Sequence, residues 1–317
     1  MEYKPVLAKN QIHSPEEYKS TFPVIVMPKL DGFRCGITLP KPPNVDYKEG
    51  KYDVPDTVVG WSRNKKNIRS LYVQYILQKF YEVNGPGWDG ELIAGDNFQE
   101  AAVVTQKGSK DEPIDFTFVI FDYVPGYNTK FTDRLDKCYD AIGNFIVEYP
   151  EYAKHFSLVT FKLVIDLKGL LTAYNELKTP EGCMLRVIHN DLDNGYHEDK
   201  RDPNLIKVKP FQQSEAIIIG FEEEKYGKNL KTVPEHLWGT TKGRAGKLKV
   251  HGLANTPFSD KEWNIGSGLT HEQRQDIYDN FEENWNNKII TFKYLESGTK
   301  NKPRHPVFLG FREDLYA

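Results

Sequence analysis

The sequence predicts an α+β protein of two domains, in which a larger mixed domain is followed by a small β-barrel of OB type. Three observations lead to this prediction. The chain has 317 residues, more than one ordinary core accommodates. Strand and helix patterns alternate along its first two thirds, and several short strands with one helix fill the rest. We place the domains at residues 1–211 and 212–317, with a hinge at 210–213; patterning alone leaves other small barrels open.

Capping signals and apolar periodicity predict the elements of the first domain. Ser14-Pro15-Glu16-Glu17 indicates a helix start in which serine caps and Glu17 closes a capping box. A segment rich in proline, glycine and charge at 40–56 is typical of a loop insertion. The remaining elements are strands at 24–27 and 116–121 and helices at 71–83 and 134–149.

The second domain is predicted as strands separated by turns, with one helix among them. The apolar runs at 217–221, 247–250 and 289–294 have the composition of strands. A helix is expected over 270–284, where Thr270 and Gln273 have the spacing of a capping box.

Composition indicates a folded, intracellular protein. Hydrophobic residues make up 39% of the chain and aromatic residues 13%, which is enough to bury cores. There is no apolar run of membrane-spanning length and no signal-peptide core after Met1, so we expect a cytoplasmic protein without membrane partners. The three cysteines are far apart in the sequence, which favours a reducing compartment over a disulfide framework.

Net charge does not indicate nucleic-acid binding, but the distribution of charge leaves it open. The formal net charge is −3 and the pI is near 6.3. Between Lys225 and Lys249, however, seven cationic residues face a single acid, Glu235, and three glutamates at 222–224 precede this stretch. A solvated face is the ordinary interpretation of such a run, and a phosphate-binding surface is the alternative.

Charged residues recur in short islands at predicted strand ends or turns. The chain has neither the G-x-x-x-x-G-K-[ST] phosphate loop nor the G-x-G-x-x-G turn, so phosphate chemistry would depend on cationic side chains. The islands are KLDGFR at 29–34, SR at 62–63, DGEL at 89–92, FDY at 121–123, EGCMLR at 181–186 and LIKVKP at 205–210.

Considered together, the islands contain the residue types of a phosphate-binding site. Lys207 and Lys209 are two residues apart on a strand, so both ammonium groups share a face, which is costly in a buried sheet unless an anion such as phosphate neutralises them. Glu91 and Glu181 each adjoin glycine, where backbone approaches a ligand closely. Individually, each island has an ordinary interpretation: Asp31-Gly32 is a common turn, and K-x-K is often a polar edge strand. Their joint occurrence favours a site.

In this order the islands resemble the motifs of the covalent nucleotidyltransferase superfamily, which comprises ATP-dependent DNA ligases, RNA ligases and mRNA capping enzymes. The match spans residues 28–210. Two further strings, WNIGSGL at 263–269 and RHPVFLGFR at 304–312, resemble the OB domain of small phage and viral DNA ligases. The resemblance implies a nucleotidyltransferase (adenylation) domain of antiparallel sheets with helices, followed by an OB-fold domain.

The resemblance implies that Lys29 attacks the α-phosphate of ATP and forms a lysyl-AMP. The attack requires a neutral amine, and lysine, unlike arginine, can be deprotonated. Burial and neighbouring cations lower a lysine pKa, and Arg34, Arg63, Lys207 and Lys209 are suited to this. The same cations would neutralise phosphate charge during transfer.

Further roles follow from the same resemblance. Glu91 would hold the ribose, Phe121 would stack on adenine, and Glu181 would bind Mg²⁺, with Mn²⁺ as an alternative ion. Asp31 would position the waters of that metal. AMP would then pass to a DNA 5′-phosphate, and a 3′-hydroxyl would displace it. The implied substrates are ATP and nicked duplex DNA, and we expect a monomer.

The predicted OB region carries candidate DNA contacts. We interpret residues 225–244 as a latch loop that folds onto DNA, because no region long enough for a large N-terminal DNA-binding domain precedes Lys29. Zinc and BRCT modules are not expected either. The R-x-D-K pattern of many relatives is missing, and Arg304 and Arg312 are candidates for orienting the leaving group. The latch candidates are Lys225, Lys228, Lys231, Lys242 and Arg244.

Two other classes of function remain open from the sequence. RNA ligases and GTP-using capping enzymes share the K-x-D-G core, although the I-G-S-G-L and R-H-P-x-F strings and the lack of a triphosphatase region favour DNA ligase. A non-catalytic nucleic-acid-binding protein could also retain the fold. The complete set of charged islands argues against that class, because unused buried cations would only destabilise it.

Overall fold

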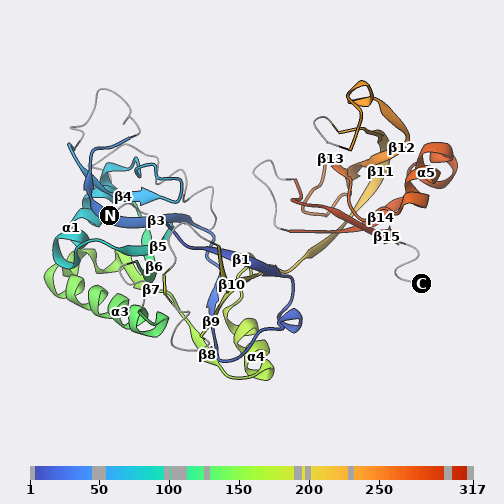
Figure 1. Ribbon diagram of the computed structural model, residues 1–317. Helices are drawn as coiled ribbons and strands as arrows, with labels where there is room; N and C mark the ends of the chain where they lie inside the picture. Colours follow the sequence, from blue (N-terminus) through green and yellow to red (C-terminus); the bar gives the residue numbers. More distant parts are fainter. Residues whose placement is uncertain are drawn as a thin grey trace. The chain divides into compact units, whose positions relative to one another are not determined.

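The computed structural model divides into two compact units, Met1–Lys209 and Pro210–Ala317 (Figure 1). The boundary predicted from sequence is 211/212. Each unit is described by itself. The structure describes residues 4–44, 55–95, 101, 113–124, 129–188, 195–196, 201–227, 232–295 and 302–312.

Two five-stranded sheets form the first unit. One has the order β1-β10-β9-β2-β8, and the other has the order β4-β3-β5-β6-β7. Most pairs are antiparallel, as expected, but β1 pairs with β10 and β6 with β7 in parallel, so both sheets are mixed. The strands are β1 (Leu7–Ile12), β2 (Val24–Pro28), β3 (Phe33–Lys41), β4 (Val58–Ser62), β5 (Trp88–Ile93), β6 (Thr117–Tyr123), β7 (Phe156–Leu158), β8 (Lys162–Val164), β9 (Cys183–Val187) and β10 (Arg201–Val208).

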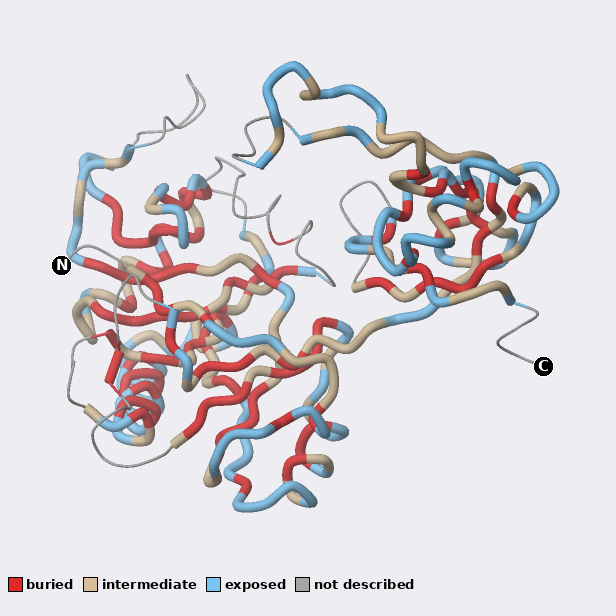
Figure 2. The backbone as a smooth tube through the Cα atoms, turned by 45° about the vertical axis from the view of Figure 1, so that its right-hand side comes forward, coloured by how far each residue is buried: buried red, intermediate tan, exposed pale blue. Residues whose placement is uncertain are grey.

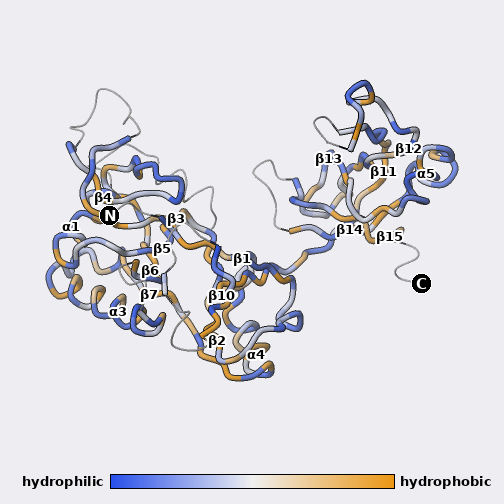
Figure 3. The backbone as a smooth tube through the Cα atoms, in the orientation of Figure 1, coloured by the Kyte–Doolittle hydropathy of each residue, from blue (hydrophilic) through white to orange (hydrophobic). Residues whose placement is uncertain are grey.

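Helices α1 (Leu71–Asn84) and α3 (Phe131–Glu148) cover the second of these sheets, and both match predicted helices. The side chain of Ser70 accepts a hydrogen bond from Val73 N and starts α1, whose apolar face then packs into the core. Helix α4 (Leu167–Leu177) packs on the other sheet beside β2, one of the most hydrophobic strands (Figure 3). The predicted strands at 24–27 and 116–121 are β2 and β6.

The predicted helix at Ser14 is only a single 3₁₀ turn, η1 (Pro15–Glu17). The capping box is wrong, because the Glu17 carboxylate accepts from His13 N at 3.0 Å, and Ser14 makes no side-chain cap within the described chain. Extended backbone at Tyr18 (φ −65°, ψ 119°) ends the turn. In the predicted loop at 40–56, β3 continues to Lys41, and residues 45–54 lie outside the described residues. A second 3₁₀ turn, η2 (Pro150–His155), follows α3.

The second unit is built on one antiparallel sheet with the strand order β13-β12-β11-β14-β15. An isolated bridge between Ser267 and Val307 joins the segment after one edge strand to the other edge, which gives the sheet an OB-like curl without a continuous closed ladder among the described residues. The elements are β11 (Gln212–Lys225), η3 (Glu235–Leu237), β12 (Thr241–Gly252), β13 (Glu262–Ile265), α5 (His271–Asp279), α6 (Phe281–Asn284), β14 (Ile289–Tyr294) and β15 (Val307–Phe311).

The helix predicted over 270–284 is confirmed in its first part. Thr270 and Gln273 form both bonds of the capping box. The helix breaks at Asn280 (φ −130°, ψ 34°), and α6 starts after it. Each unit has its own buried core, shown in red in Figure 2.

Candidate active site

Lys29 follows β2 directly and is fixed by backbone bonds to the turn that precedes β9. Its N–H donates to Gly182 O at 3.0 Å, and its carbonyl accepts from Thr179 Oγ1 at 2.6 Å. Gly182 has φ +94°, a conformation that favours glycine. These bonds place two sequence-distant islands side by side, because β2 and β9 are neighbours in the sheet.

The side chains of these two islands form an ion cluster with Lys209 of a third island. Lys29 Nζ lies 2.6 Å from Glu181 Oε2, and Lys209 Nζ lies 3.0 Å from the same oxygen. The side chains are only 20%, 9% and 13% exposed for Lys29, Glu181 and Lys209. One carboxylate thus holds two ammonium groups.

Gly32 is required by close packing. The predicted Asp31-Gly32 turn is a bend, and Gly32 is not among the residues with positive φ. A Cβ at Gly32 would lie 2.4 Å from Leu92 O and 2.8 Å from Glu91 Cγ. The loop after Lys29 therefore touches β5 at Glu91, and only glycine leaves room for this approach.

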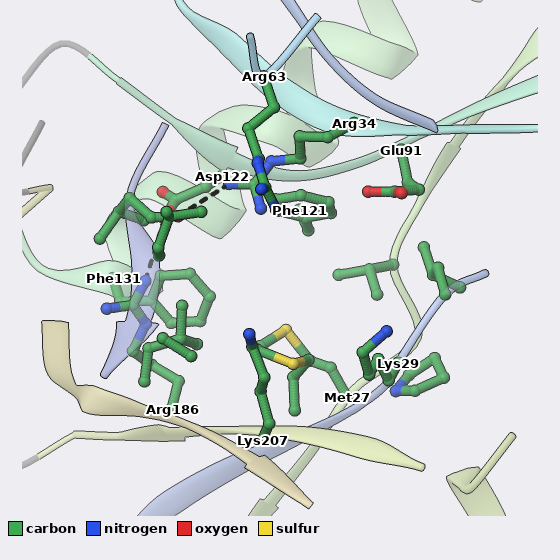
Figure 4. A pocket seen from close by; sticks show the side chains of 18 residues that line it. Met27, Lys29, Arg34, Arg63, Glu91, Phe121, Asp122, Phe131, Arg186 and Lys207 are labelled. Carbon is green, nitrogen blue, oxygen red and sulfur yellow. Dashed lines mark hydrogen bonds and ion pairs between the residues drawn. The ribbon is translucent and has the colours of Figure 1, made fainter. Parts of the chain in front are cut away.

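The predicted nucleotide-binding residues converge on one cavity of about 210 Å³ (Figure 4). Six of the eight line it, and the other two, Glu181 and Lys209, contact or flank Lys29 as described. Figure 4 shows Phe121, Arg34 and Arg63 on one wall. It shows Lys29 and Lys207 on the opposite wall. The six lining residues are Lys29, Arg34, Arg63, Glu91, Phe121 and Lys207.

Apolar side chains complete the cavity, and sequence reasoning missed them. Met27 and Met184 come from neighbouring strands β2 and β9, and Phe131 comes from the start of α3. Val6 to Ala8, at the start of β1, form a further part of the wall. The signal for these residues is only apolar character, which they share with the core. An aromatic and apolar cavity with cations on two facing walls suits a nucleoside phosphate.

Burial and charge alter the ionisation of two lining residues. Burial raises the pKa of Glu91 to about 7, although Arg34 and Lys29 oppose the shift. Burial also lowers the pKa of Lys207, and the neighbouring Lys29 and Lys209 add to this effect. The neighbouring cations that were expected to lower the pKa of a lysine in this cluster therefore act on Lys207.

A buried charge network that sequence reasoning did not identify reaches the cavity wall through Asp122 and Arg186. Asp122 accepts from Arg134 Nε at 2.6 Å, and Arg186 bridges Asp122 and Asp202. All four side chains are at most 3% exposed. Asp122 and Arg186 belong to the FDY and EGCMLR islands, but no sequence signal marks Arg134 or Asp202.

The donor set fits a hard divalent ion only together with substrate oxygens. Among the described residues, no group of three or more histidine, cysteine, aspartate or glutamate side chains gathers to hold a metal. Glu181 supplies one carboxylate beside Lys29. Mg²⁺ is commonly bound by one or two carboxylates with phosphate oxygens and water, so Glu181 fits such a site. Asp31 is exposed and close enough to Glu91 to help raise its pKa, after the larger effect of burial.

Three of the five predicted DNA contacts, Lys225, Lys242 and Arg244, lie on the β11–β12 hairpin. Glu224 accepts from Lys242 Nζ and Arg244 Nε, both at 2.6 Å. These bonds, from Arg244 first and then Lys242, lower the pKa of Glu224 to about 2. Lys225 is exposed at the end of β11, and Lys228 and Lys231 lie outside the described residues.

The two arginines proposed for leaving-group orientation lie near β15 in the second unit. Arg312 Nη1 is 3.2 Å from Glu215 Oε2, and Arg304 is exposed, with its carbonyl accepting from Leu295 N at 3.0 Å. Their predicted role stays a prediction.

Residues 239–312 match the family model described as the DNA ligase OB-like domain. The chain is similar to the solved Lig E DNA ligases, with 21% identity, a TM-score of 0.55, and coverage of 97% of this chain and 99% of theirs. It is similar to Pmar-Lig with 20% identity, a TM-score of 0.64, and coverage of 98% and 67%. A Chlorella virus DNA ligase-adenylate shares 25% identity over 98% and 99% of the two chains, with a TM-score of 0.49. No curated protein matches.

The first two structural matches show that the chain has their fold along nearly its whole length. The predicted α+β fold class, with sheets and helices followed by an OB-like domain, is therefore confirmed, whereas the predicted closed barrel is not formed by the described strands. Within this class, the structures and the family model to which the chain is similar are those of DNA ligases. None of the helices in the described part of the chain is long and apolar enough to span a bilayer.

Proposed function

We propose that this protein is an ATP-dependent DNA ligase that seals nicks in duplex DNA. One observation carries the proposal: six motif residues, separated by up to 178 positions between Lys29 and Lys207, line one cavity beside the Lys29–Glu181 ion pair. The OB-like match of the second unit supports DNA as the polymer.

The cavity residues supply what covalent adenylation requires. Phe121, Met27 and Met184 offer apolar surfaces for a base, and Glu91 offers a carboxyl for ribose hydroxyls. Lys29 attacks the α-phosphorus, forms an N–P bond and expels pyrophosphate. Arg34, Arg63 and Lys207 line the same cavity and would neutralise charge that develops on the phosphate oxygens.

The later steps use the same cavity. A DNA 5′-phosphate oxygen attacks the lysyl-AMP phosphorus and releases the Lys29 amine. The 3′-hydroxyl then attacks the 5′-phosphorus and expels AMP, so one phosphodiester forms for each ATP consumed. Glu181 would hold Mg²⁺, or Mn²⁺ in its place, with Asp31 positioning its waters, and the ion would polarise phosphate oxygens when bound.

Cationic residues of the β11–β12 hairpin would bind the duplex. Lys225, Lys242 and Arg244 lie on this hairpin, and phosphate contacts from such residues give salt-dependent binding without base specificity. We infer that the segment 225–244 acts as the latch that holds the duplex and that the protein acts as a monomer.

Covalent labelling tests the proposed function. The protein is incubated with α-labelled ATP or GTP and Mg²⁺ and then denatured. Label from ATP is expected in the wild type and in Lys19→Ala, an exposed lysine of the same unit, and is expected to be lost in Lys29→Ala. Label from GTP alone would indicate a capping enzyme, and no label from either nucleotide would overturn the proposal. Sealing of nicked DNA but not of nicked RNA is expected in the next assay.

A further inference from the structure

A closed ring of hydrogen bonds lies behind the cavity wall. Val6 N donates to the Tyr196 hydroxyl at 3.0 Å, and this hydroxyl donates to Asp89 Oδ2 at 2.5 Å. Asp89 accepts from Arg34 Nη2 at 2.6 Å and, on its other oxygen, from Arg34 Nε at 2.7 Å. Arg34 Nη2 closes the ring on Val6 O at 3.4 Å. Four groups from distant parts of the chain therefore fix one another.

The ring joins the cavity wall to a buried support. Arg34 lines the cavity, and its guanidinium lies 4.5 Å from the centre of the Phe121 ring. Asp89 is fully buried, and Tyr196 is 1% exposed. Among the described lining residues, Arg34 and Val6 belong to both the ring and the cavity, whereas Asp89 and Tyr196 stand behind them.

We propose that Tyr196 is a positioning residue that sets the Arg34 guanidinium through Asp89; this inference rests on the proposed function. A carboxylate with two arginine bonds can still rotate and shift together with the arginine. The Tyr196 hydroxyl removes this freedom, because it fixes Asp89 Oδ2 and is itself fixed by a backbone amide. Burial, and then the charge of Asp89, raise the pKa of Tyr196 well above 10, so the hydroxyl stays a donor at working pH.

The position of Arg34 matters because its charge acts on phosphate oxygens only at close range. Preorganised donors stabilise developing charge without reorganisation during the reaction, and small misplacements of such groups slow reactions strongly. Arg34 also lies over the Phe121 ring, so its displacement would change the surface offered to the base. Tyr196 thus influences the reaction without touching the substrate.

Tyr196→Phe tests the proposal, because it removes the hydroxyl and keeps the ring. The rate of lysyl-AMP formation at saturating ATP is expected to fall about tenfold, the size typical for a lost bond to a charged group. The ATP concentration for half-maximal rate is expected to stay within about twofold. Tyr18→Phe is the matched control: it removes another hydroxyl bond, to Thr21 O at 2.6 Å, outside the cavity, and is expected to leave the rate unchanged.

A double-mutant cycle with Arg34→Lys separates positioning from a general structural role. Lysine keeps a cation beside Asp89 but cannot form the paired bonds. If Tyr196 acts through Arg34, Tyr196→Phe is expected to cause no further loss in the Arg34→Lys background. If the rate losses of the two single substitutions multiplied in the double variant, the inference would be overturned. It would also be overturned if Tyr196→Phe formed lysyl-AMP as fast as the wild type. In both cases covalent label in the wild type would still support a ligase. No label in the wild type would overturn both. Circular dichroism melting confirms that each variant is folded.

Discussion

Two ion pairs with the same geometry differ in their surroundings between the two units. In the first unit, Arg134 Nε and Asp122 Oδ1 are 2.6 Å apart, with side chains 0% and 3% exposed. In the second unit, Arg244 Nε and Glu224 Oε2 are also 2.6 Å apart, but the side chains are 28% and 26% exposed. Distance is the same, so burial decides what each pair contributes.

Under the proposed function, the difference would correspond to two ways of binding phosphate. Around the cavity, buried carboxylates hold cations in fixed positions, which suits chemistry on one small substrate. On the β11–β12 hairpin, half-exposed glutamates hold cations that water and salt reach, which suits exchange of partners along a duplex. The predictions below test this contrast, starting with the largest expected effect.

The substitution Asp122→Asn is expected to lower the free energy of unfolding of the first unit by about 3–5 kcal/mol. It removes the carboxylate that accepts from the fully buried Arg134 at 2.6 Å, and breaking a buried pair from one side is costly. Urea unfolding monitored by circular dichroism measures the change. Asp136→Asn, at an exposed position of α3, is the control and is expected to change it by less than about 0.5 kcal/mol. A loss below about 1 kcal/mol for Asp122→Asn would mean that burial does not distinguish the two ion pairs.

Gly32→Ala tests the tight packing at the cavity. The added Cβ would meet Leu92 O at 2.4 Å, so the loop that carries Lys29 must move away from β5. We expect about 2 kcal/mol of lost stability and a slower lysyl-AMP reaction. In contrast, Gly143→Ala in α3 meets nothing within 4 Å and is expected to stabilise by up to about 1 kcal/mol. Equal effects of the two substitutions would contradict a packing role for Gly32.

The sequence predicted which residues gather around the cavity better than it predicted the buried residues that hold them in place. Lys29, Glu181 and Lys207 were found because their residue types and order form a recognisable motif, and the structure brings them together. Tyr196 and Arg134 were missed, because a buried bond between distant residues leaves no local pattern. Likewise, Gly32 was interpreted as a turn residue, since its contact with β5 depends on tertiary packing.

The pH dependence of stability isolates Glu91. Its pKa is raised by burial to about 7, so between about pH 4.5 and 7 the unfolded chain loses a proton that the folded protein keeps. Stability due to this group is therefore present at low pH and lost as pH rises through 7. From pH 5 to 8, the free energy of unfolding of the wild type, measured in urea, is expected to fall by about 1–2 kcal/mol more than that of Glu91→Gln. This figure includes a reduction for the partial solvent exposure of Glu91. Parallel pH profiles would show that Glu91 ionises normally.

The smallest expected effect concerns the hairpin. Glu224→Gln removes the charge that holds Lys242 and Arg244, and because these side chains are partly open to solvent, stability is expected to change by less than about 1 kcal/mol. Both cations then become available to phosphates, so affinity for nicked duplex is expected to rise about two- to fivefold, with a steeper salt dependence. Fluorescence anisotropy across a salt titration measures both quantities.

Glu215→Gln is the matched control for the hairpin test, because it releases Arg312, which lies outside the proposed latch and is 3.2 Å from Glu215. We expect the control to leave the salt dependence closer to wild type than Glu224→Gln does. If Glu224→Gln left affinity and salt slope unchanged, Lys242 and Arg244 would not contact DNA, and the basic run would be a solvated face. If Glu224→Gln instead lowered the free energy of unfolding by several kcal/mol, the Arg244–Glu224 pair would behave like the buried Arg134–Asp122 pair. Solvent exposure would then not account for the difference between the two units.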